Sequence, residues 1–320
     1  MTGVSGLPFI SICIPAYQRA GKLNRLLQSI SGQTFTGYEI IISDDSPGNE
    51  VEQLLPAWSS LPIVYHKNTP SLGTPANWNK AIEQARGQWI KLMHDDDWFA
   101  TPDSLQQFAD AALNQAACFI FSGCINRHTV SGKSIEEHLS GDKKQLLEQN
   151  PLNLFHRNVI GHPSVVMYKK DPALYYNLQY KWVVDIDFYM RYLQKHPGFV
   201  YLPGLLVNIG VDDTQVSGGC YKNPAVEIPE YLSLLSGYPH EMLLTNPHIF
   251  SCVWNLVQRF NIRKLEYIRQ SGYSGPLPLP LQKIIDYQKP VPAFVLKQPP
   301  WSETLMKRCF RQINNLAAGF

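Results

Sequence analysis

Hydrophobic residues in the first third of the chain occur in short β-prone runs, and most runs are followed by a segment with helical spacing. The runs predict four strands, at residues 9–14, 38–43, 63–66 and 88–93. Apolar residues spaced three or four apart predict helices between them, at residues 23–30, 51–58 and 75–85. Because strands and helices alternate in this way over roughly the first 95 residues, the pattern predicts a parallel sheet built from βαβ units.

The alternation continues less regularly towards residue 220. Helices are predicted at residues 102–117 and 182–193, and strands at residues 118–122, 165–168 and 199–206. Residues 126–150 are polar with weak periodicity, and we expect a mobile loop or a helical insertion there. After residue 220 helical spacing returns, with a Pro-rich linker at 275–280. We therefore predict an α/β domain at residues 1–220 and a helical extension at residues 221–320.

The composition is that of a globular protein, with 44% hydrophobic and 17% charged residues among 320. The net charge of +2 is unevenly distributed, because residues 250–320 contain ten Lys or Arg and only three acidic residues. The acidic remainder would repel a nucleic-acid backbone, which argues against nucleic-acid binding. The basic end can face phospholipid headgroups or a lipid-linked phosphate, or it can be an ordinary charged surface.

The six cysteines are scattered without a CxxC pair, which favours a reducing compartment over a disulfide framework or a zinc site. We see no signal peptide at the N-terminus and no run of about 18 apolar residues. We therefore expect a soluble or peripheral protein in the cytoplasm, whose membrane contact is at most with the inner face.

Two acidic clusters follow predicted strands. Asp95, Asp96 and Asp97 come after the strand at 88–93, and Asp44-Asp45 follows the strand at 38–43. The carboxyl ends of parallel strands share one edge of a sheet, where open α/β sheets bind ligands. Neighbouring carboxylates repel one another, and a hard cation such as Mg²⁺ or Mn²⁺ relieves that repulsion. A solvated turn that caps the next helix is the alternative for one cluster, but two clusters on one edge favour a ligand site.

Two further carboxylates, Asp185 and Asp187, lie in the first turn of the helix predicted at 182–193, where the helix dipole alone would favour them. His94 and His162 can approach the acidic edge, although an ordinary structural role is more common for histidine. No G-x-G-x-x-G or G-x-x-x-x-G-K-[ST] motif follows a predicted strand, so neither a dinucleotide-binding fold nor a P-loop is supported.

Four landmarks together resemble the family 2 glycosyltransferases, inverting enzymes with the GT-A fold. Residues 15–19 are similar to the family's "IPTYNR", and residues 39–46 to its "EIIVVDDGS". The run from Gly73 through Asn79 and Gly87 to the acidic triplet resembles its "G…N…A.G.yi..lDxDD", and residues 184–191 resemble "EDYDLWLR". The matches occur in order over roughly residues 8–220. The fold implied is a Rossmann-like, mostly parallel sheet flanked by helices.

The resemblance implies transfer of a sugar from a nucleotide diphosphate sugar, with a UDP-sugar as the expected donor. The acceptor would be a hydroxyl of a saccharide or a lipid-linked precursor in surface polysaccharide synthesis. Asp97, the last residue of the D-x-D, would bind Mn²⁺ or Mg²⁺, and Asp185 would be the general base. The expected nucleotide-binding residues are Pro15, Tyr17, Arg19, Asp45, Asn79, Asp95 and Asp96.

The sequence departs from the family pattern at two points. Val184 replaces the Glu that usually precedes the catalytic Asp, which leaves Asp187 as a second candidate base. Gly210-Val211-Asp212 replaces an "RvH" element, so Asp212 or Asp213 can stand in for its histidine, with His162 a further candidate. Two other functions stay open, a nucleotidyltransferase-like enzyme and an inactive nucleotide- or glycan-binding module.

The last predicted helix, residues 301–316, is amphipathic and basic. Its apolar face can pack against the rest of the protein or a partner, or it can lie in a membrane interface. The sequence leaves these alternatives open.

Overall fold

The computed structural model describes residues 6–114, 117–128, 131–212, 216–239 and 241–317. The chain divides into two compact units. The first comprises Met1–Pro151, Val159–Leu178 and Asp187–Gln215, and the second comprises Leu152–Asn158, Gln179–Ile186 and Val216–Phe320. The predicted boundary at residue 220 lies near the last of these divisions. Local periodicity gave no sign that two earlier segments belong to the second unit, because it does not report which unit a segment packs against.

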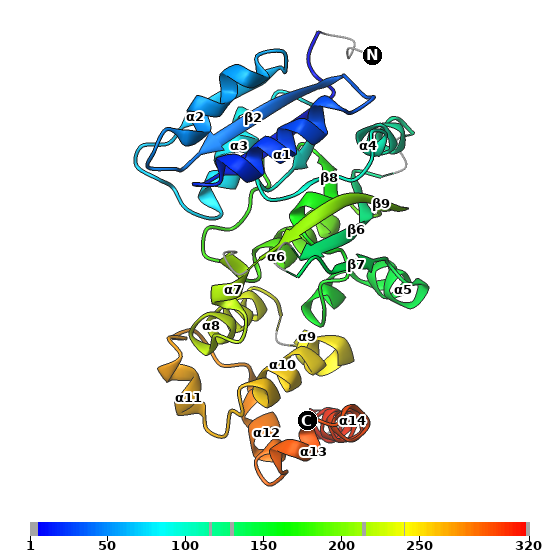
Figure 1. Ribbon diagram of the computed structural model, residues 1–320. Helices are drawn as coiled ribbons and strands as arrows, with labels where there is room; N and C mark the ends of the chain where they lie inside the picture. Colours follow the sequence, from blue (N-terminus) through cyan, green and yellow to red (C-terminus); the bar gives the residue numbers. More distant parts are fainter. Residues whose placement is uncertain (1–5, 115–116, 129–130, 213–215, 240, 318–320) are drawn as a thin grey trace. The chain divides into compact units, whose positions relative to one another are not determined.

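The first half of the sheet is parallel, as predicted. Its strands are β1 (Ile10–Ala16), β2 (Tyr38–Asp44), β3 (Ile63–Lys67) and β4 (Trp89–Leu92), in the order β3-β2-β1-β4. The connecting helices are α1 (Ala20–Ser31), α2 (Glu50–Leu54) with the 3₁₀ turn η1 (Leu55–Trp58), and α3 (Ala76–Gln84) (Figure 1). Every residue of β1 is buried, so this central strand is covered on both faces.

The second half of the sheet is mixed, which the sequence pattern did not predict. The order continues from β4 through β8 (Val166–Lys169), β6 (Phe119–His128) and β9 (Val200–Val211) to β5 (Trp98–Phe99). The β4–β8, β8–β6 and β9–β5 pairs are antiparallel, whereas β6 and β9 are parallel. Helices α4 (Ser104–Leu113) and α6 (Val184–Lys195) occupy two of the predicted helical regions.

The polar region at 126–150 contains regular structure rather than only a loop or a helix. It includes β7 (Ser134–Glu137), which pairs antiparallel with β6, and α5 (Gly141–Gln149). All four residues of β7 are exposed. Without a buried face, the strand lacks the apolar alternation that would have predicted it. Two 3₁₀ turns, η2 (Pro151–Phe155) and η3 (Pro163–Val165), precede β8.

The register of the parallel strands brings their carboxyl ends to one edge. Ala16 at the end of β1 pairs with Asp44 at the end of β2, and Cys13 of β1 pairs with Leu92 at the end of β4. The loop from β4 to β5 therefore begins beside the carboxyl end of β1. This confirms the prediction that both acidic clusters emerge at the same edge of the sheet.

The described part of the second unit is helical. Its helices are α7 (Val216–Cys220), α8 (Pro224–Ser236), α9 (Glu241–Thr245), α10 (Pro247–Arg259), α11 (Leu265–Gln270), α12 (Leu279–Gln288), α13 (Ala293–Leu296) and α14 (Pro299–Ala317). Helix α10 is the centre of the unit's core, with Phe250 and Trp254 almost fully buried. Helix α12 begins inside the segment that was predicted to be a linker.

Helix α14 packs on α10 through its apolar face. The Phe310 and Phe250 rings lie 5.0 Å apart, and the Trp254 indole donates a 3.0 Å hydrogen bond to Ser302 Oγ. Cys309 on α14 is buried as well, whereas Trp301 keeps 65% of its surface exposed. Packing within the unit therefore accounts for the buried face of this helix. No helix among the described residues is long and apolar enough to cross a membrane.

Candidate active site

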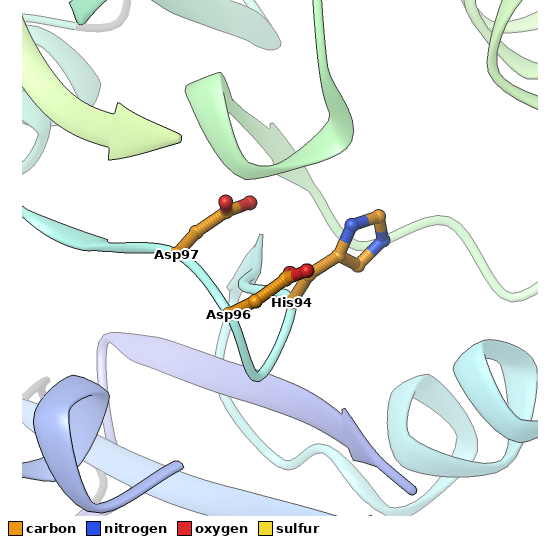
Figure 2. A group of neighbouring side chains, drawn as sticks. All are labelled: His94, Asp96 and Asp97. Carbon is orange, nitrogen blue, oxygen red and sulfur yellow. The ribbon is translucent and has the colours of Figure 1, made fainter. Parts of the chain in front are cut away.

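The loop after β4 gathers three potential metal ligands. Ligand atoms of His94, Asp96 and Asp97 all lie within 4.8 Å of one another, and Figure 2 shows the three side chains projecting from this one loop. Among the residues that the structure describes, these form the only such group of three or more His, Cys, Asp or Glu side chains. The amide of Asp97 donates a 3.1 Å hydrogen bond to the carbonyl of His94, which closes the loop into a turn.

Asp97 is the most enclosed of the three. Its Oδ1 accepts a 3.0 Å hydrogen bond from the amide of Gly210, and the Ser164 side chain also hydrogen-bonds to its carboxyl group. Burial raises the pKa of Asp97 well above its usual value, and repulsion from Asp96 raises it further. A cation beside this carboxylate would offset both effects.

His94 offers a neutral ring. Burial lowers its pKa to about 4, so the imidazole is uncharged near neutral pH. The ring lies 4.7 Å from Trp78, and its buried Nε2 has no hydrogen-bond partner in the structure. A buried polar atom without a partner is costly, and a neutral imidazole nitrogen is a good metal ligand. Sequence alone supported His94 as a ligand only weakly, through its position two residues before Asp96.

These residues fit a divalent cation. Two carboxylates suit Mg²⁺ or Mn²⁺, and a neutral imidazole nitrogen suits transition metals. Asp212, expected to replace the family's histidine, is not among the three; it forms an ion pair with Lys22 instead. Asp213 lies outside the described residues. His162, at the start of η3, is close enough to influence the pKa of His94 but is not part of the cluster.

The strand before this loop, β4, contains a fully buried lysine, Lys91, which the sequence pattern did not single out. The ammonium group of Lys91 donates hydrogen bonds to the carbonyls of Ser164 and Val166, and it lies 4.7 Å from the Phe108 ring. Burial lowers its pKa to about 7, and the negative charge of Asp97 opposes that shift. When protonated, Lys91 therefore balances part of the charge of the acidic loop from inside the sheet.

The loop after β1 contacts the acidic loop directly. The amide of Tyr17 donates a 3.1 Å hydrogen bond to Asp95, and the Arg19 guanidinium lies 2.9 Å from Asp96 and 3.5 Å from Asp95. Burial and the charge of Asp96 raise the pKa of Asp95 to about 7 despite this guanidinium. Pro15 is buried at the end of β1, whereas Tyr17 is 51% exposed. The predicted residues from these two loops therefore do lie together.

Asp45 lies at the end of β2, and its carboxylate organises a neighbouring loop. It accepts hydrogen bonds from the Asn68 amide group at 2.8 Å, the Leu72 amide at 3.1 Å and the Gly73 amide at 2.7 Å. A carboxylate has about four acceptor positions, so these three hydrogen bonds do not exhaust its capacity. The adjacent Asp44 is bound to Ser46, Tyr65 and Lys67 and is structural.

The side chain of Asn79 is bound to a backbone segment. Its side-chain amide donates to the carbonyl of Tyr176 at 2.8 Å, and its side-chain oxygen accepts from the amide of Tyr176 at 2.9 Å. Both polar ends of the side chain are thus used to fix the backbone at residue 176. Asn79 therefore makes a structural contact, and its role in nucleotide binding stays a prediction.

The two candidate bases on α6 have different environments. Asp187 is buried and paired with Arg191, whose Nε and Nη2 lie 2.9 and 2.6 Å from one of its oxygens. Asp185, in the second unit, accepts hydrogen bonds of 2.8 Å from the Asn158 side chain and from the Ile186 amide. Burial raises the pKa of Asp185 to about 6, and these two hydrogen bonds only partly oppose the shift. A carboxylate with this pKa is better suited to accept a proton near neutral pH than one with the ordinary Asp value of 3.8.

Comparison with known proteins identifies the family. The sequence profile described as Glycosyl transferase family 2 matches residues 11–173, about half of the chain. The chain belongs to glycosyl transferase family 2. The match includes the loops after β1, β2 and β4 and ends before α6.

Relatives and solved structures agree with this family. The GalNAc(5)-diNAcBac-PP-undecaprenol beta-1,3-glucosyltransferase of Campylobacter jejuni is 26% identical over 151 residues, which are 44% of this chain and 48% of the relative. S. aureus TarS in complex with UDP-GlcNAc superposes with a TM-score of 0.58 at 16% identity, covering 88% of this chain and 91% of TarS. The mannosyltransferase PcManGT of Pyrobaculum calidifontis, in complex with GDP-Man and Mn²⁺, gives 0.58 at 12% identity, covering 97% and 88%.

These similarities establish the fold of this family 2 member. It is the GT-A fold, as the sequence predicted, with additional C-terminal helices. The chain spans roughly half the length of the first curated relatives that it matches, 61% and 45% for the first two.

Proposed function

We propose that this protein is an inverting, metal-dependent glycosyltransferase that uses a UDP-sugar as donor. The observation that carries the proposal is the convergence of His94, Asp96 and Asp97, whose ligand atoms lie within 4.8 Å of one another. This group lies at the carboxyl edge of the parallel half of the sheet, where ligands of α/β proteins bind. In the solved PcManGT complex, a protein of the same fold holds GDP-Man and Mn²⁺, which supports the same ligand class here.

In this proposal the nucleotide binds the loops after β1, β2 and β4. Pro15 and Tyr17 line the base pocket, and Asp45 accepts a hydrogen bond from the ring N–H of uracil through its remaining acceptor capacity. Asp95 and Asp96 act at the ribose. Arg19 neutralises the acidic loop in the absence of nucleotide, and its guanidinium is suited to a diphosphate oxygen when the donor is bound.

Asp97, together with Asp96 and His94, would hold Mn²⁺ or Mg²⁺. When bound, the cation neutralises charge on the departing diphosphate and so makes the nucleotide a better leaving group. The buried environment of these side chains excludes water and strengthens their electrostatic contacts.

Asp185 is the proposed general base. It removes the proton from the acceptor hydroxyl as that oxygen attacks the anomeric carbon opposite to the leaving nucleotide, and a single displacement inverts the configuration. The shifted pKa of about 6 supports this assignment over Asp187, whose carboxylate is bound to Arg191. Asp187, His162 and Asp212 have no catalytic role in the proposal.

The proposed acceptor is a saccharide or a lipid-linked precursor of a surface polysaccharide, at the cytoplasmic face of the membrane. The Campylobacter relative, named for an undecaprenyl diphosphate-linked glycan, supports this acceptor class. The exposed Trp301 and the basic side chains of α14 support peripheral membrane contact, because indole rings and cations favour the interface of an anionic bilayer.

Calorimetric titration tests the donor class. UDP, GDP and CDP are added separately to the wild-type protein with Mn²⁺ and with EDTA, and then to Asp97→Ala. We expect UDP binding that requires Mn²⁺ and is lost in Asp97→Ala. A matched control is Asp103→Ala, because Asp103 is an exposed carboxylate before α4, outside the cluster.

The other outcomes separate the alternatives. Binding of GDP instead of UDP would retain the transferase and replace the uracil assignment. No binding of any nucleotide would reject the proposal. Nucleotide binding without product from a panel of UDP-sugars and saccharide acceptors would favour the inactive binding module. Release of diphosphate from a nucleoside triphosphate and a sugar phosphate would favour the nucleotidyltransferase.

A further inference from the structure

The second unit contains a pocket that the proposed donor site does not use. It has a volume of about 330 Å³ and lies between the segment at 179–180, helix α8 and the loop at 272–275. This volume is at the lower end of the roughly 300–1,000 Å³ range of small-molecule sites. The space therefore suits a ligand the size of a sugar ring better than a whole nucleotide sugar.

The chemistry of the lining indicates which kind of ligand fits. Hydroxyl groups come from Ser233, Ser236 and Ser274, aromatic rings from Tyr180 and Tyr273, and a carboxylate from Glu230. Hydroxyls and a carboxylate can both bind the hydroxyl groups of a ligand, and aromatic rings offer apolar faces. The described residues that line this pocket include no Lys or Arg, which disfavours a phosphate.

The pocket walls are held in place by internal hydrogen bonds. The Tyr273 hydroxyl donates to the carbonyl of Pro276 at 2.9 Å, and the hydroxyls of Tyr180 and Ser233 lie 3.4 Å apart. At Gly275, a Cβ would lie 2.6 Å from the Tyr273 hydroxyl, so this glycine allows the loop to close over the ring. A site whose walls are already ordered loses less entropy on binding.

One side chain of the pocket also holds the segment that leads to Asp185. Glu230 accepts hydrogen bonds from three consecutive backbone amides, those of Lys181 at 3.0 Å, Trp182 at 2.8 Å and Val183 at 3.1 Å. Helix α6 begins at the next residue, and Asp185 is its second residue. The position of Glu230 therefore affects the backbone that carries the proposed general base.

We propose that this pocket is a subsite for one sugar unit of the acceptor, held through Glu230, the serine hydroxyls and the two tyrosine rings. The inference rests on the proposed function in that it assigns the sugar to the acceptor. Occupancy of the subsite would fix Glu230 and, through the backbone at 181–183, the segment that carries Asp185.

Ligand-observed NMR on the full-length protein tests the subsite without requiring activity. The probes are methyl glycosides of glucose, galactose, mannose, rhamnose and N-acetylglucosamine. Each is added with excess UDP and Mn²⁺, so that the donor site is filled. We expect saturation transfer to at least one glycoside. The signal is lost in Ser236→Trp and in Ser274→Trp, which place an indole in the pocket from two exposed positions.

The control is Thr304→Trp, which adds the same indole at an exposed position on α14, away from the pocket lining. Thermal unfolding of all three variants confirms that they are folded, and two independent blocking positions guard against misfolding of one. Absence of transfer to every glycoside, or transfer that is unchanged in both blocking variants, would overturn the subsite. UDP resonances in the same samples report donor binding separately, so failure of the donor assignment is distinguishable.

Discussion

The backbone amide of Gly210 donates a 3.0 Å hydrogen bond to Oδ1 of Asp97. This bond joins the end of β9 to the loop after β4, although 113 residues separate the two in sequence. Gly210 is the first residue of the Gly210-Val211-Asp212 segment, in which Asp212 takes the position of the histidine in the resembled family's "RvH" element. The contact helps to fix the carboxylate that we propose as the principal metal ligand.

Gly210 is expected to be intolerant of any side chain. A Cβ at this position would lie 2.4 Å from the carbonyl oxygen of Asp96, a distance that backbone atoms can relieve only by moving. Gly210→Ala should therefore displace the acidic loop. We expect the affinity for UDP in the presence of Mn²⁺ to fall by about tenfold or more, and a tenfold change is equivalent to about 1.4 kcal/mol. Calorimetry measures the change. Gly219→Ala, where a Cβ meets nothing within 4 Å, is the control and should bind as the wild type does.

His94→Phe tests the imidazole as a ligand. The phenyl ring keeps the packing against Trp78 but removes the unpartnered Nε2. We expect thermal stability without metal to be close to that of the wild type, and the increase in Tm on adding Mn²⁺ to become smaller. Loss of even an outer-shell partner typically costs 10–100-fold in metal affinity, so loss of a ligand should cost about tenfold or more. An unchanged Mn²⁺-induced increase in Tm would remove His94 from the metal site.

The raised pKa of Asp185 predicts a pH dependence of activity. Its carboxylate must be ionised to accept a proton, so kcat should fall about tenfold per pH unit below about pH 6. Asp185→Asn should lower kcat by about 10²–10⁴-fold, the usual contribution of a general base. Product formation measured from pH 5 to 8 checks both statements. A flat profile in the wild type, with full activity in the variant, would reject Asp185 as the base.

The same pKa shift predicts that Asp185→Asn stabilises the folded protein to a degree that depends on pH. Because the folded-state pKa is raised from 3.8 to about 6, the folded state binds more protons between these pH values, and ionisation at higher pH destabilises it. Asp185→Asn avoids that cost, so relative to the wild type it should be more stable at pH 7 than at pH 4, by up to about 3 kcal/mol. Urea unfolding at the two pH values measures the difference. An equal effect at both would show that burial does not shift this carboxyl group.

Asp187→Asn should separate structural from catalytic roles on α6. The substitution leaves Arg191 without its carboxylate, so we expect a loss of unfolding free energy of about 3–5 kcal/mol. At temperatures where the variant is folded, the pH profile of kcat should keep its shape, because the base is unchanged. If Asp187→Asn abolished the fall in kcat below about pH 6 and Asp185→Asn did not, Asp187 would be the general base and Asp185 the structural carboxylate.

The sequence by itself determined the parallel half of the fold and the place of its acidic loops. Apolar runs at β1, β2 and β4 are local signals, and the carboxyl ends of parallel strands meet at one edge of a sheet. The sequence alone therefore predicted that Asp45 and Asp95 to Asp97 lie at the same edge. The family resemblance, carried by short motifs near these strand ends, likewise required only local sequence.

The tertiary structure decided what depends on partners distant in the chain. The exposed strand β7 has no apolar alternation, and its pairing with β6 follows from backbone hydrogen bonds rather than from a sequence pattern. Asn79 holds the backbone of Tyr176, which is 97 positions away in sequence, and His94 gains significance because its ring nitrogen is buried without a partner. Periodicity reports which face of an element is buried, but not which atoms meet it there. That is decided only when the chain is packed.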